Sequence, residues 1–411
     1  MSFDKVEIWV HDHVLKNEKL RHALYGLYQR GMYLLRRPKK CVGAVQCLSP
    51  KDDQEYFFGY YDKSPLDSKG ERALMLQVAS ATKRADSTDT ANILVVDIKT
   101  GEHRAVAKSC SWNVQQGCML QWLDDEQILF NDFRENRHVS VILNLNTGAE
   151  RTLPCPVYAV SEDKKTALSL DFARLHRLRP GYGYANAPEA TKGQLCPDTP
   201  CIFRMDLTTG ETVPVMNYTD LAALSPRPEM EGAEHKVNHL MISPNGRRFM
   251  VLHRWFQKGV KYTRLVTANM DGSEPYVLAD DDFVSHCCWK DDTHILSYMN
   301  KNPGGKGYYL MTDRTGECRR LWQHLAMDGH PTYSPDGSYT VTDTYPDRTR
   351  IQSIYVMQGD EVKTAVKVFS PFRYGGDVRC DLHPRWVNGG RQICFDATFE
   401  GKRRVYLAEL P

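Results

Sequence analysis

The chain has 411 residues, of which 41% are hydrophobic and 25% are charged, and its formal net charge is +2. This composition allows a large buried core, and the small net charge leads us to expect no nucleic-acid partner. No apolar run approaches the roughly 18 residues of a membrane-spanning helix, and the first residues lead us to expect no signal peptide. Twelve irregularly spaced cysteines do not make a disulfide framework, so we expect reduced thiols in the cytoplasm.

The first 40 residues differ from the rest of the chain. Aromatic and aliphatic side chains such as Tyr25, Leu27 and Leu34 alternate there with basic ones such as Arg30 and Lys40. This pattern predicts a basic amphipathic helical extension over residues 1–40. Two interpretations remain open: the helix packs against the flank of the following domain, or residues 16–40 make peripheral contact with an anionic membrane such as the inner membrane.

From residue 41 onward, pairs of short strands joined by tight polar turns recur seven times. The turns are Ser68-Lys69-Gly70, Asp124-Asp125, Glu162-Asp163, Pro244-Asn245-Gly246, Asp291-Asp292, Pro335-Asp336-Gly337 and Asn388-Gly389-Gly390. A further strand pair follows most of these hairpins, which gives four-stranded units with a period of roughly 40–50 residues. The sequence therefore predicts an all-β protein, a seven-bladed β-propeller over residues 41–411 with a short helical N-terminal extension.

The ends of the predicted propeller complement each other. The last unit lacks a fourth strand, and an apolar stretch at 41–48 precedes the first unit without a partner. Pairing 41–48 with 404–410 closes the ring and leaves no open sheet edge.

Four consecutive units carry a histidine at the same position, five residues before the turn: His239, His286, His330 and His383. A single histidine at a strand start is usually structural, but four imidazoles around one channel would repel one another when protonated. Neutral imidazoles together with a Cys or Asp side chain suit a divalent transition metal. We therefore predict a metal at His286, His330 and His383, with Cys380 or Asp328 nearby.

Basic residues gather on the side of the propeller where these histidines lie. The start of each first strand, the end of each second strand and the loop that follows share this side, and the long insertions 78–92, 172–200 and 225–238 lie there too. Insertions on one side of a repeat array usually mark the binding surface. The side carries Arg134 and Arg254, and the segment 174–184 adds Arg174, His176, Arg177, Arg179, Tyr182 and Tyr184. This local positive charge predicts an anionic ligand.

Several of these short motifs resemble those of the β-propeller polysaccharide lyases, the oligogalacturonate lyases and ulvan lyases. The similar segments are Asn238-His239, Ser285-His286, Gly329-His330, His383-Pro384-Arg385-Trp386, Gln116–Trp122, Asn131-Asp132 and residues 174–184. Relatives of this type, which share Phe58–Pro65, resemble proteins of bacterial surface-polysaccharide gene clusters. The resemblance implies a lyase that cleaves an acidic, uronate-containing polysaccharide or oligosaccharide by β-elimination.

The resemblance also implies roles for individual residues. His286 and His383 correspond to ligands of a divalent metal (Mn, Zn or Ca), and Cys380 stands where the pectin-cleaving enzymes use Gln. His239 is the candidate base and Tyr184 or Tyr182 the candidate acid, because elimination needs both. Substrate contacts are expected from Arg177, Arg254, Arg134, Arg174, His176 and Gln116.

Two other functions fit the same residues. A non-catalytic glycan-binding or scaffold propeller in capsule or exopolysaccharide assembly would use the same basic surface. A glycan-modifying hydrolase or transferase would need paired carboxylates, for which Asp132, Asp171, Asp343 and Asp396 are available.

Overall fold

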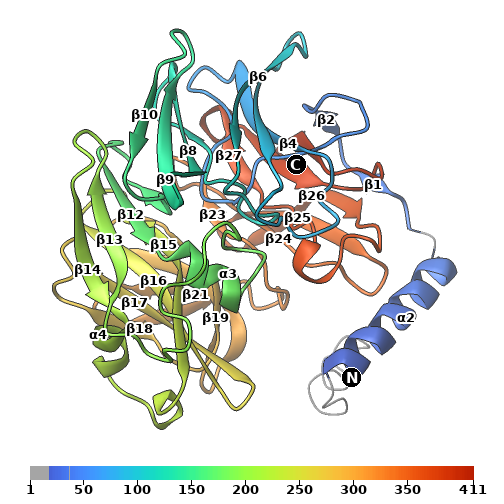
Figure 1. Ribbon diagram of the computed structural model, residues 1–411. Coiled ribbons are helices and arrows are strands. Elements are labelled where there is room, and N and C mark those ends of the chain that lie inside the picture. Colours follow the sequence, from blue (N-terminus) through green and yellow to red (C-terminus); the bar gives the residue numbers. More distant parts are fainter. Residues whose placement is uncertain (1–17, 37) are drawn as a thin grey trace.

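The computed structural model describes residues 18–36 and 38–411, and these form a seven-bladed β-propeller with a helix at its periphery (Figure 1). The strands of the described residues lie in seven antiparallel sheets arranged around a central axis. Apart from the two N-terminal strands, the strands of each sheet follow chain order from the axis outward, so neighbouring strands are antiparallel and consecutive in the chain. This architecture confirms the fold expected from the repeat.

The first four blades follow one another without interruption. Blade 1 consists of β3 (Glu55–Phe57), β4 (Arg72–Val78), β5 (Ala91–Asp97) and β6 (His103–Ser109). Blade 2 consists of β7 (Gln121–Trp122), β8 (Gln127–Arg134), β9 (Arg137–Asn144) and β10 (Glu150–Leu153). Blade 3 consists of β11 (Ala159–Val160), β12 (Thr166–Leu170), β13 (Pro200–Asp206) and β14 (Thr212–Asn217). Blade 4 consists of β15 (Glu234–Ile242), β16 (Arg248–Gln257), β17 (Val260–Asn269) and β18 (Tyr276–Ala279).

The last three blades complete the ring. Blade 5 consists of β19 (Val284–Trp289), β20 (His294–Lys301), β21 (Gly305–Thr312) and β22 (Cys318–Leu321). Blade 6 consists of β23 (Thr332–Tyr333), β24 (Thr340–Asp343), β25 (Ile351–Gln358) and β26 (Glu361–Phe369). Blade 7 consists of β27 (Arg385–Val387), β28 (Gln392–Ala397) and β29 (Arg404–Glu409).

Blade 7 receives its fourth strand from the other end of the chain. In β2 (Val45–Cys47), Val45 pairs with Ala408 and Cys47 with Tyr406 of β29. The preceding β1 (Cys41–Val42) pairs instead with β26, so it extends blade 6 to five strands. The stretch 41–48 is thus divided between two neighbouring blades: its first strand extends blade 6, and its second strand completes blade 7.

Three of the polar turns between first and second strands share one backbone conformation. Gly70, Gly246 and Gly337 all have φ of 70°, a value that glycine adopts at little cost and other residues rarely do. In the last two of these turns the preceding Asn245 or Asp336 side chain accepts a hydrogen bond from the serine that opens the turn. These turns repeat because the same residue types impose the same chain reversal.

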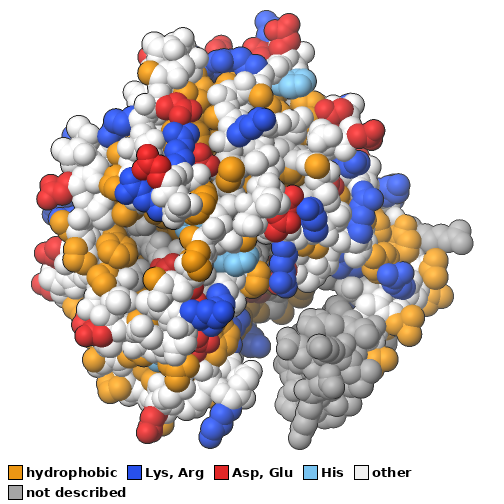
Figure 2. All heavy atoms as spheres, in the orientation of Figure 1, with side chains coloured by type: hydrophobic (Ala, Val, Ile, Leu, Met, Phe, Trp, Pro, Cys, Tyr) orange, Lys and Arg blue, Asp and Glu red, His pale blue; other side chains and the backbone are white. Residues whose placement is uncertain are grey.

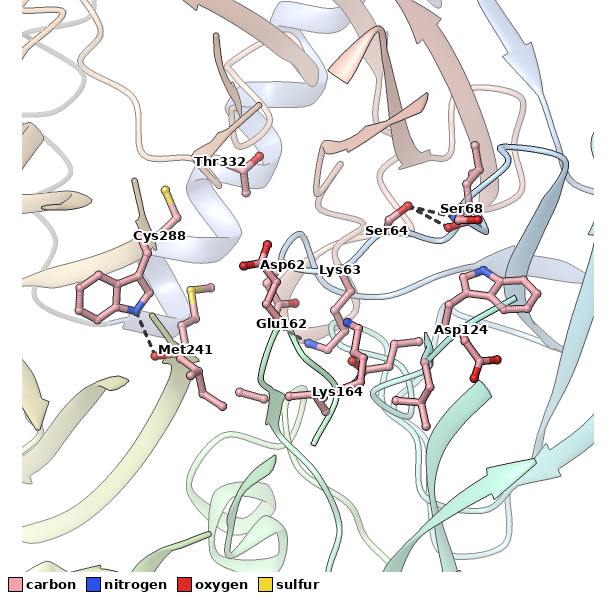
Figure 3. A pocket seen from close by; sticks show the side chains of 18 of the residues that line it. Asp62, Lys63, Ser64, Ser68, Asp124, Glu162, Lys164, Met241, Cys288 and Thr332 are labelled. Carbon is pink, nitrogen blue, oxygen red and sulfur yellow. Dashed lines mark hydrogen bonds and ion pairs between the residues drawn. The ribbon is translucent and has the colours of Figure 1, made fainter. Parts of the chain in front are cut away.

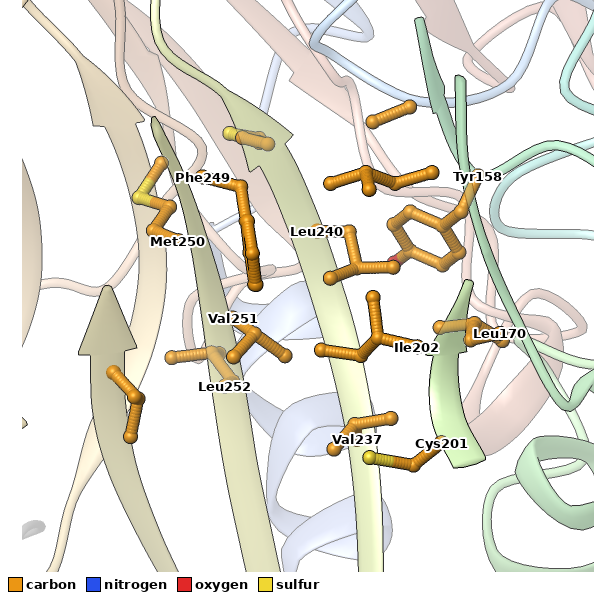
Figure 4. Packing of buried hydrophobic residues seen from close by; sticks show 14 of the residues in the cluster. Tyr158, Leu170, Cys201, Ile202, Val237, Leu240, Phe249, Met250, Val251 and Leu252 are labelled. Carbon is orange, nitrogen blue, oxygen red and sulfur yellow. The ribbon is translucent and has the colours of Figure 1, made fainter. Parts of the chain in front are cut away.

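The core lies between adjacent blades. Between blades 3 and 4, side chains such as Ile202, Leu240, Val251 and Leu252 interdigitate and are 0% exposed (Figure 4). Burial of one such aliphatic side chain contributes roughly 1.5–3 kcal/mol. Because every blade packs on two neighbours, the positions of the first strands around the axis are fixed by these contacts.

Short helices lie in the loops and one longer helix precedes the propeller. They are α2 (Glu18–Arg36), α3 (Phe172–Leu178), α4 (Tyr218–Ala223) and the 3₁₀ turns Pro228–Met230, Gly376–Val378 and Asn388–Gly390. The predicted helical extension over 1–40 is therefore found at α2, and its first 17 residues lie outside the described part. No helix of the described residues is long and apolar enough to cross a membrane.

Candidate active and metal-binding site

The four repeated histidines lie on the innermost strands or just before them. His239 and His286 lie within β15 and β19, at places where the pairing with the second strand shifts register. His330 and His383 precede β23 and β27 by two residues. Because all four occupy equivalent points of successive blades, their side chains converge on the axis.

The imidazoles form one continuous cluster, which we call the histidine cluster (His239, His286, His330 and His383). The ring centroids are 5.5 Å apart for His239 and His286, 3.9 Å for His286 and His330, and 4.3 Å for His330 and His383. All four side chains are between 0% and 2% exposed. The convergence predicted from the repeat is therefore present, and the cluster is buried.

Three of the four rings have Nδ1 fixed by an oxygen acceptor. Nδ1 of His286 is 3.1 Å from Asp328 Oδ1, that of His330 is 2.8 Å from Asp343 Oδ1, and that of His383 is 2.8 Å from the Gly59 carbonyl. A nitrogen that faces a carboxylate or carbonyl carries a proton, so in the neutral form of each ring Nε2 keeps its lone pair. Metal-ligating histidines are oriented in this way. For His330, burial lowers the pKa but the Asp343 carboxylate outweighs it, so the net shift of the pKa is upward.

The rings of His330 and His383 lie close to the carboxylate of Asp381. The ligand atoms of His330, Asp381 and His383 all lie within 4.8 Å of one another. Within the described part of the chain no hydrogen-bond partner reaches Nε2 of His330 or of His383. Two orphaned nitrogens beside a carboxylate form a donor set that suits a divalent cation.

The other predicted ligands lie next to this group. The His286 ring lies 3.9 Å from that of His330 at a tilt of 42°, but His286 is not among the three residues whose ligand atoms converge. Sγ of Cys380 lies 3.8 Å from the carbonyl oxygen of Asp381, and burial raises the pKa of this thiol to about 12. The thiol therefore stays protonated, and the acidic residue that faces the two histidines is Asp381.

Two histidines of the cluster have a strained backbone. His239 has φ of 59° and His383 has φ of 46°, in the left-handed region that disfavours side chains with a Cβ. Such conformations cost of order 1–3 kcal/mol and concentrate at functional sites. The strain directs both imidazoles toward the axis, where regular strand geometry would not place them.

Two tyrosines that the sequence reasoning did not select lie among the histidines. Tyr60 and Tyr61 follow β3 and are each 2% exposed. The Tyr60 hydroxyl contacts His239 Nε2, and its ring centroid is 5.0 Å from that of His383. The Tyr61 ring is 5.1 Å from His330. Blade 1 thus supplies tyrosines at the level where blades 4 to 7 supply histidines.

The surroundings of His239 differ from those of the other three rings. Its Nδ1 is 2.6 Å from Asn238 Nδ2, and its backbone N–H donates to the Tyr158 hydroxyl. Gln116, a predicted substrate contact, donates to that same hydroxyl from a buried position. Burial lowers the pKa of His239 far below its usual value, and neighbouring His286 and Arg254 add to the shift. His239 is therefore a neutral imidazole in contact with a tyrosine.

Next to the histidines lies a group of cations without acidic partners, which we call the cationic cluster. It consists of Arg179, Lys236, Arg254 and Lys261. Arg254 and Lys236 are 4% and 1% exposed, and none of the four forms an ion pair with a described carboxylate. Burial and Arg179 lower the pKa of Arg254 to about 10. Burial lowers the pKa of Lys236 well below its usual value, so the lasting buried charge of this group belongs to Arg179 and Arg254. Buried positive charge without a counter-ion favours an anionic ligand.

The other predicted substrate-binding arginines already have carboxylate partners. Arg174 is buried and pairs with Glu189, and Arg177 pairs with both Glu189 and Glu234. Arg134 pairs with Asp132 and Glu150 at the edge of blade 2. His176 is half-buried, and burial lowers its pKa. Arg174 and Arg177 thus hold the 174–200 insertion in place, and Arg254 is the predicted substrate-binding arginine that remains uncompensated.

The two candidate acids occupy different environments. The Tyr184 ring stacks on Phe172 at 4.3 Å, and its hydroxyl accepts a hydrogen bond from Asn131, which marks a structural residue. The Tyr182 ring lies 3.6 Å from the Arg179 guanidinium and 6.3 Å from the Tyr60 ring. Its hydroxyl is buried and meets no partner in the described residues. Burial raises the pKa of Tyr182, so this phenol is a neutral proton donor beside the cationic cluster.

Gly183 holds the segment that carries Tyr182. A Cβ at this position would lie 2.1 Å from the His176 nitrogen and 2.4 Å from the Phe172 oxygen. We expect Gly183→Ala to reduce the free energy of unfolding by about 1–3 kcal/mol, because backbone atoms cannot make room without repacking. Urea unfolding would measure this. Gly316→Ala is the control, since nothing lies within 4 Å of its added methyl, and an equal loss in both variants would contradict the expectation.

A separate cavity lies at the opposite mouth of the channel (Figure 3). Its volume is about 680 Å³, and Asp62, Lys63, Glu162, Lys164 and Cys288 are among its lining residues. Tyr60 and Tyr61 directly precede Asp62 and contact the histidine cluster. They therefore separate this cavity from the site, and the chemistry described above does not open into it.

Comparison with known proteins shows similarity of fold. No protein-family model matches the sequence. An oligogalacturonate lyase from Vibrio parahaemolyticus superposes with a TM-score of 0.63 at 14% identity, over 90% of this chain and 94% of that one. An oligogalacturonate lyase in complex with manganese gives a TM-score of 0.65 at 17% identity, over 90% and 93% of the two chains. At these identities the similarity establishes the propeller architecture only.

Sequence similarity to curated proteins is confined to a part of the chain. The Tol-Pal system protein TolB of Francisella tularensis subsp. mediasiatica is 23% identical over 142 residues, which is 31% of this chain and 32% of TolB. The chain thus matches about a third of the length of this relative.

Proposed function

We propose that this protein is a polysaccharide lyase-like enzyme that cleaves a uronate-containing acidic glycan by β-elimination. The observation that carries the proposal is the arrangement of an uncompensated cationic cluster, a neutral imidazole (His239) and a neutral phenol (Tyr182) around one buried point. These are the three functions that elimination next to a carboxylate requires: charge neutralisation, a base and an acid. The superposition on two oligogalacturonate lyases supports this choice of reaction.

Arg254 and Arg179 are assigned to the substrate carboxylate. The proton next to a uronate carboxylate is removable only when the negative charge that develops there is stabilised. Both guanidiniums lack an acidic partner in the described structure, so a carboxylate that enters this place restores the charge balance. Arg179 also lies on the Tyr182 ring, which places the acid next to the bound charge.

His239 is assigned to proton abstraction. Arg254 and Arg179 contribute to its lowered pKa, so a carboxylate bound between those arginines offsets their field and raises the basicity of the imidazole. Substrate binding would therefore activate the base. Tyr60, in contact with Nε2, orients the ring.

A divalent cation fits His330, His383 and Asp381, with His286 beside them. The orphaned nitrogens of the two histidines and the ionised carboxylate provide the donors. Burial raises the pKa of Asp381, but the Arg379 guanidinium outweighs this effect and the net shift is downward. A bound cation supplies Lewis-acid stabilisation of the developing charge. Mn, Zn and Ca remain candidates, and the manganese complex of the similar lyase favours Mn.

The Asp381→Asn variant tests the metal site. We expect a roughly ten- to hundredfold loss of Mn²⁺ affinity, because the amide keeps the shape of the carboxylate but not its charge. Isothermal titration of Mn²⁺ into metal-free protein would measure this loss. Asp313→Asn removes a buried carboxylate that pairs with Arg248 and serves as the control. Equal affinities of the wild type and Asp381→Asn would rule out Asp381 as a ligand.

A non-catalytic glycan-binding or scaffold role in capsule or exopolysaccharide assembly is the second candidate. The burial of all four histidines favours it, because in this conformation no side chain of the histidine cluster is accessible to a polymer. The resemblance expected from the sequence, to ulvan lyases and to proteins of surface-polysaccharide gene clusters, fits either role. Twelve free cysteines support our proposal of a cytoplasmic location.

One experiment separates the two candidates. β-Elimination creates a double bond conjugated to the uronate carboxylate, so incubation of the protein with oligogalacturonate or another acidic glycan should raise the ultraviolet absorbance. Neutral oligosaccharides of the same length should give no such signal. Binding of acidic glycans without new absorbance would overturn the lyase proposal and support the assembly role.

A further inference from the structure

Helix α2 presents two different apolar surfaces, and only one of them is covered. Tyr33 stacks on Phe369 at 4.7 Å and meets Phe372 edge-on at 6.0 Å, while Gln29 donates to the Asp347 carbonyl. These contacts hold the helix against blade 6. They support the first of the two interpretations left open by the sequence, that of a helix packed on the propeller flank.

The opposite side of α2 carries a row of exposed leucines, which we call the leucine stripe. Leu24, Leu27, Leu34 and Leu35 are 45%, 68%, 66% and 80% exposed. Leu27, Leu34 and Leu35 follow Leu24 by 3, 10 and 11 residues, which places all four along one side of a helix with 3.6 residues per turn. Gln29 and Tyr33 lie on the other side, so anchoring the helix to blade 6 turns the stripe outward.

The helix is also strongly basic. Residues 18–40 contain seven Lys and Arg residues and one acidic residue, a net charge of +6, whereas the whole chain carries +2. Arg36, Lys39 and Lys40 are exposed directly after the stripe. In Figure 2, hydrophobic side chains and Lys or Arg side chains lie next to one another at the edge of the molecule where α2 is seen in Figure 1.

We propose that the leucine stripe and the basic residues around it attach this protein to the surface of an anionic lipid bilayer. Apolar side chains enter the boundary between headgroups and acyl chains, and the Lys and Arg side chains pair with anionic headgroups. The anchor to blade 6 fixes the orientation of the propeller relative to that surface. The proposal is independent of the reaction assigned to the histidine cluster.

A second copy of the chain fits the leucine stripe less well. A helix of 19 residues is about 28 Å long and about 10 Å wide, so pairing two copies would cover roughly 600 Å² in total. Stable complexes bury about 1,200 Å² or more. Pairing would also bring two helices of the same strong positive charge together, whereas an anionic bilayer complements that charge.

Co-sedimentation of the full chain with vesicles tests the proposal. We expect binding to phosphatidylcholine vesicles that contain phosphatidylglycerol and little binding to phosphatidylcholine alone. Leu34→Glu/Leu35→Glu should reduce the partition coefficient at least tenfold, and Lys39→Gln/Lys40→Gln should reduce it about fivefold for each charge removed. Leu195→Glu is the matched control, because Leu195 is 48% exposed on the propeller and its change should leave partitioning unaltered.

Circular dichroism would verify that each variant is folded. Equal partitioning of the leucine variant and the wild type, or no binding of the wild type to anionic vesicles, would overturn the proposal. A concentration-dependent dimer that Leu34→Glu/Leu35→Glu dissociates, without vesicle binding by the wild type, would also overturn it and identify a second copy as the partner.

Discussion

Replacement of His239 by alanine is expected to lower the rate of β-elimination by a factor of about 10²–10⁴, the range typical for loss of a general base. The imidazole is buried, neutral and in contact with Tyr60, and its backbone is held in a left-handed conformation that points it toward the axis. Because a base acts in the transition state, the loss should appear in kcat, while binding of the acidic oligosaccharide changes little.

His294→Ala provides the matched control for this prediction. His294 belongs to β20 of blade 5, where it pairs with Asp291 at the hairpin turn, outside the histidine cluster. The same substitution there should leave the rate unchanged. If His239→Ala retains activity within a factor of about three of the wild type, His239 is not the base. Tyr60 would then be the group to test next, since its hydroxyl shares the contact with Nε2.

The propeller could be predicted because the strand and turn patterns that specify it are local and recur along the sequence. Tight polar turns define the hairpins, and in three of them Gly70, Gly246 and Gly337 occupy the same point with a common φ of 70°. The division of 41–48 between two blades could not be predicted. It occurs at Gly43, where a Cβ would lie 2.7 Å from the Ala365 carbonyl oxygen, a close approach that involves a residue more than 300 positions away.

The candidate site was predictable to the extent that it follows the repeat. The four histidines converge because they occupy equivalent positions, but the choice between Cys380 and Asp381 depends on which of two neighbouring side chains faces the axis. Successive residues of an extended chain point to opposite sides. Cys380 and Asp381 lie before the first residue of their strand, so the alternation within the strand does not show which of the two side chains faces the axis. The structure directs Asp381 toward His330 and His383.

Contacts between distant segments account for the other differences between the predicted site and the site in the structure. Arg174 and Arg177 have the composition of a carboxylate clamp, yet Glu189 and Glu234 neutralise them in the folded chain. Tyr60 and Tyr61 were overlooked because blade 1 departs from the histidine repeat. The clue in the sequence was the unusual length of chain between Phe57 and the first turn, which has room for a segment that enters the channel.

The double variant Arg179→Met/Arg254→Met is expected to weaken binding of acidic oligosaccharides by a hundredfold or more. A hydrogen bond to a charged group contributes about 1.5–3 kcal/mol, and the two guanidiniums supply two such interactions without competing carboxylates. Titration calorimetry in the His239→Ala background would measure binding without consuming the substrate. Arg134→Met is the control, because Arg134 is already paired with Asp132 and Glu150.

The same cluster predicts how binding depends on pH. Lys261 is exposed at the edge of the cationic cluster, and the nearby charges of Arg254 and Arg179 lower its pKa to about 7. An anion favours the protonated form of Lys261, so affinity should be highest below pH 7 and should fall as the pH rises through that value. Removing Arg254 takes away the largest cause of the lowered pKa, which moves this decline to higher pH. Affinity that is independent of pH in the wild type, or neutral oligosaccharides that bind as tightly as acidic ones, would contradict the assignment of this cluster to a carboxylate.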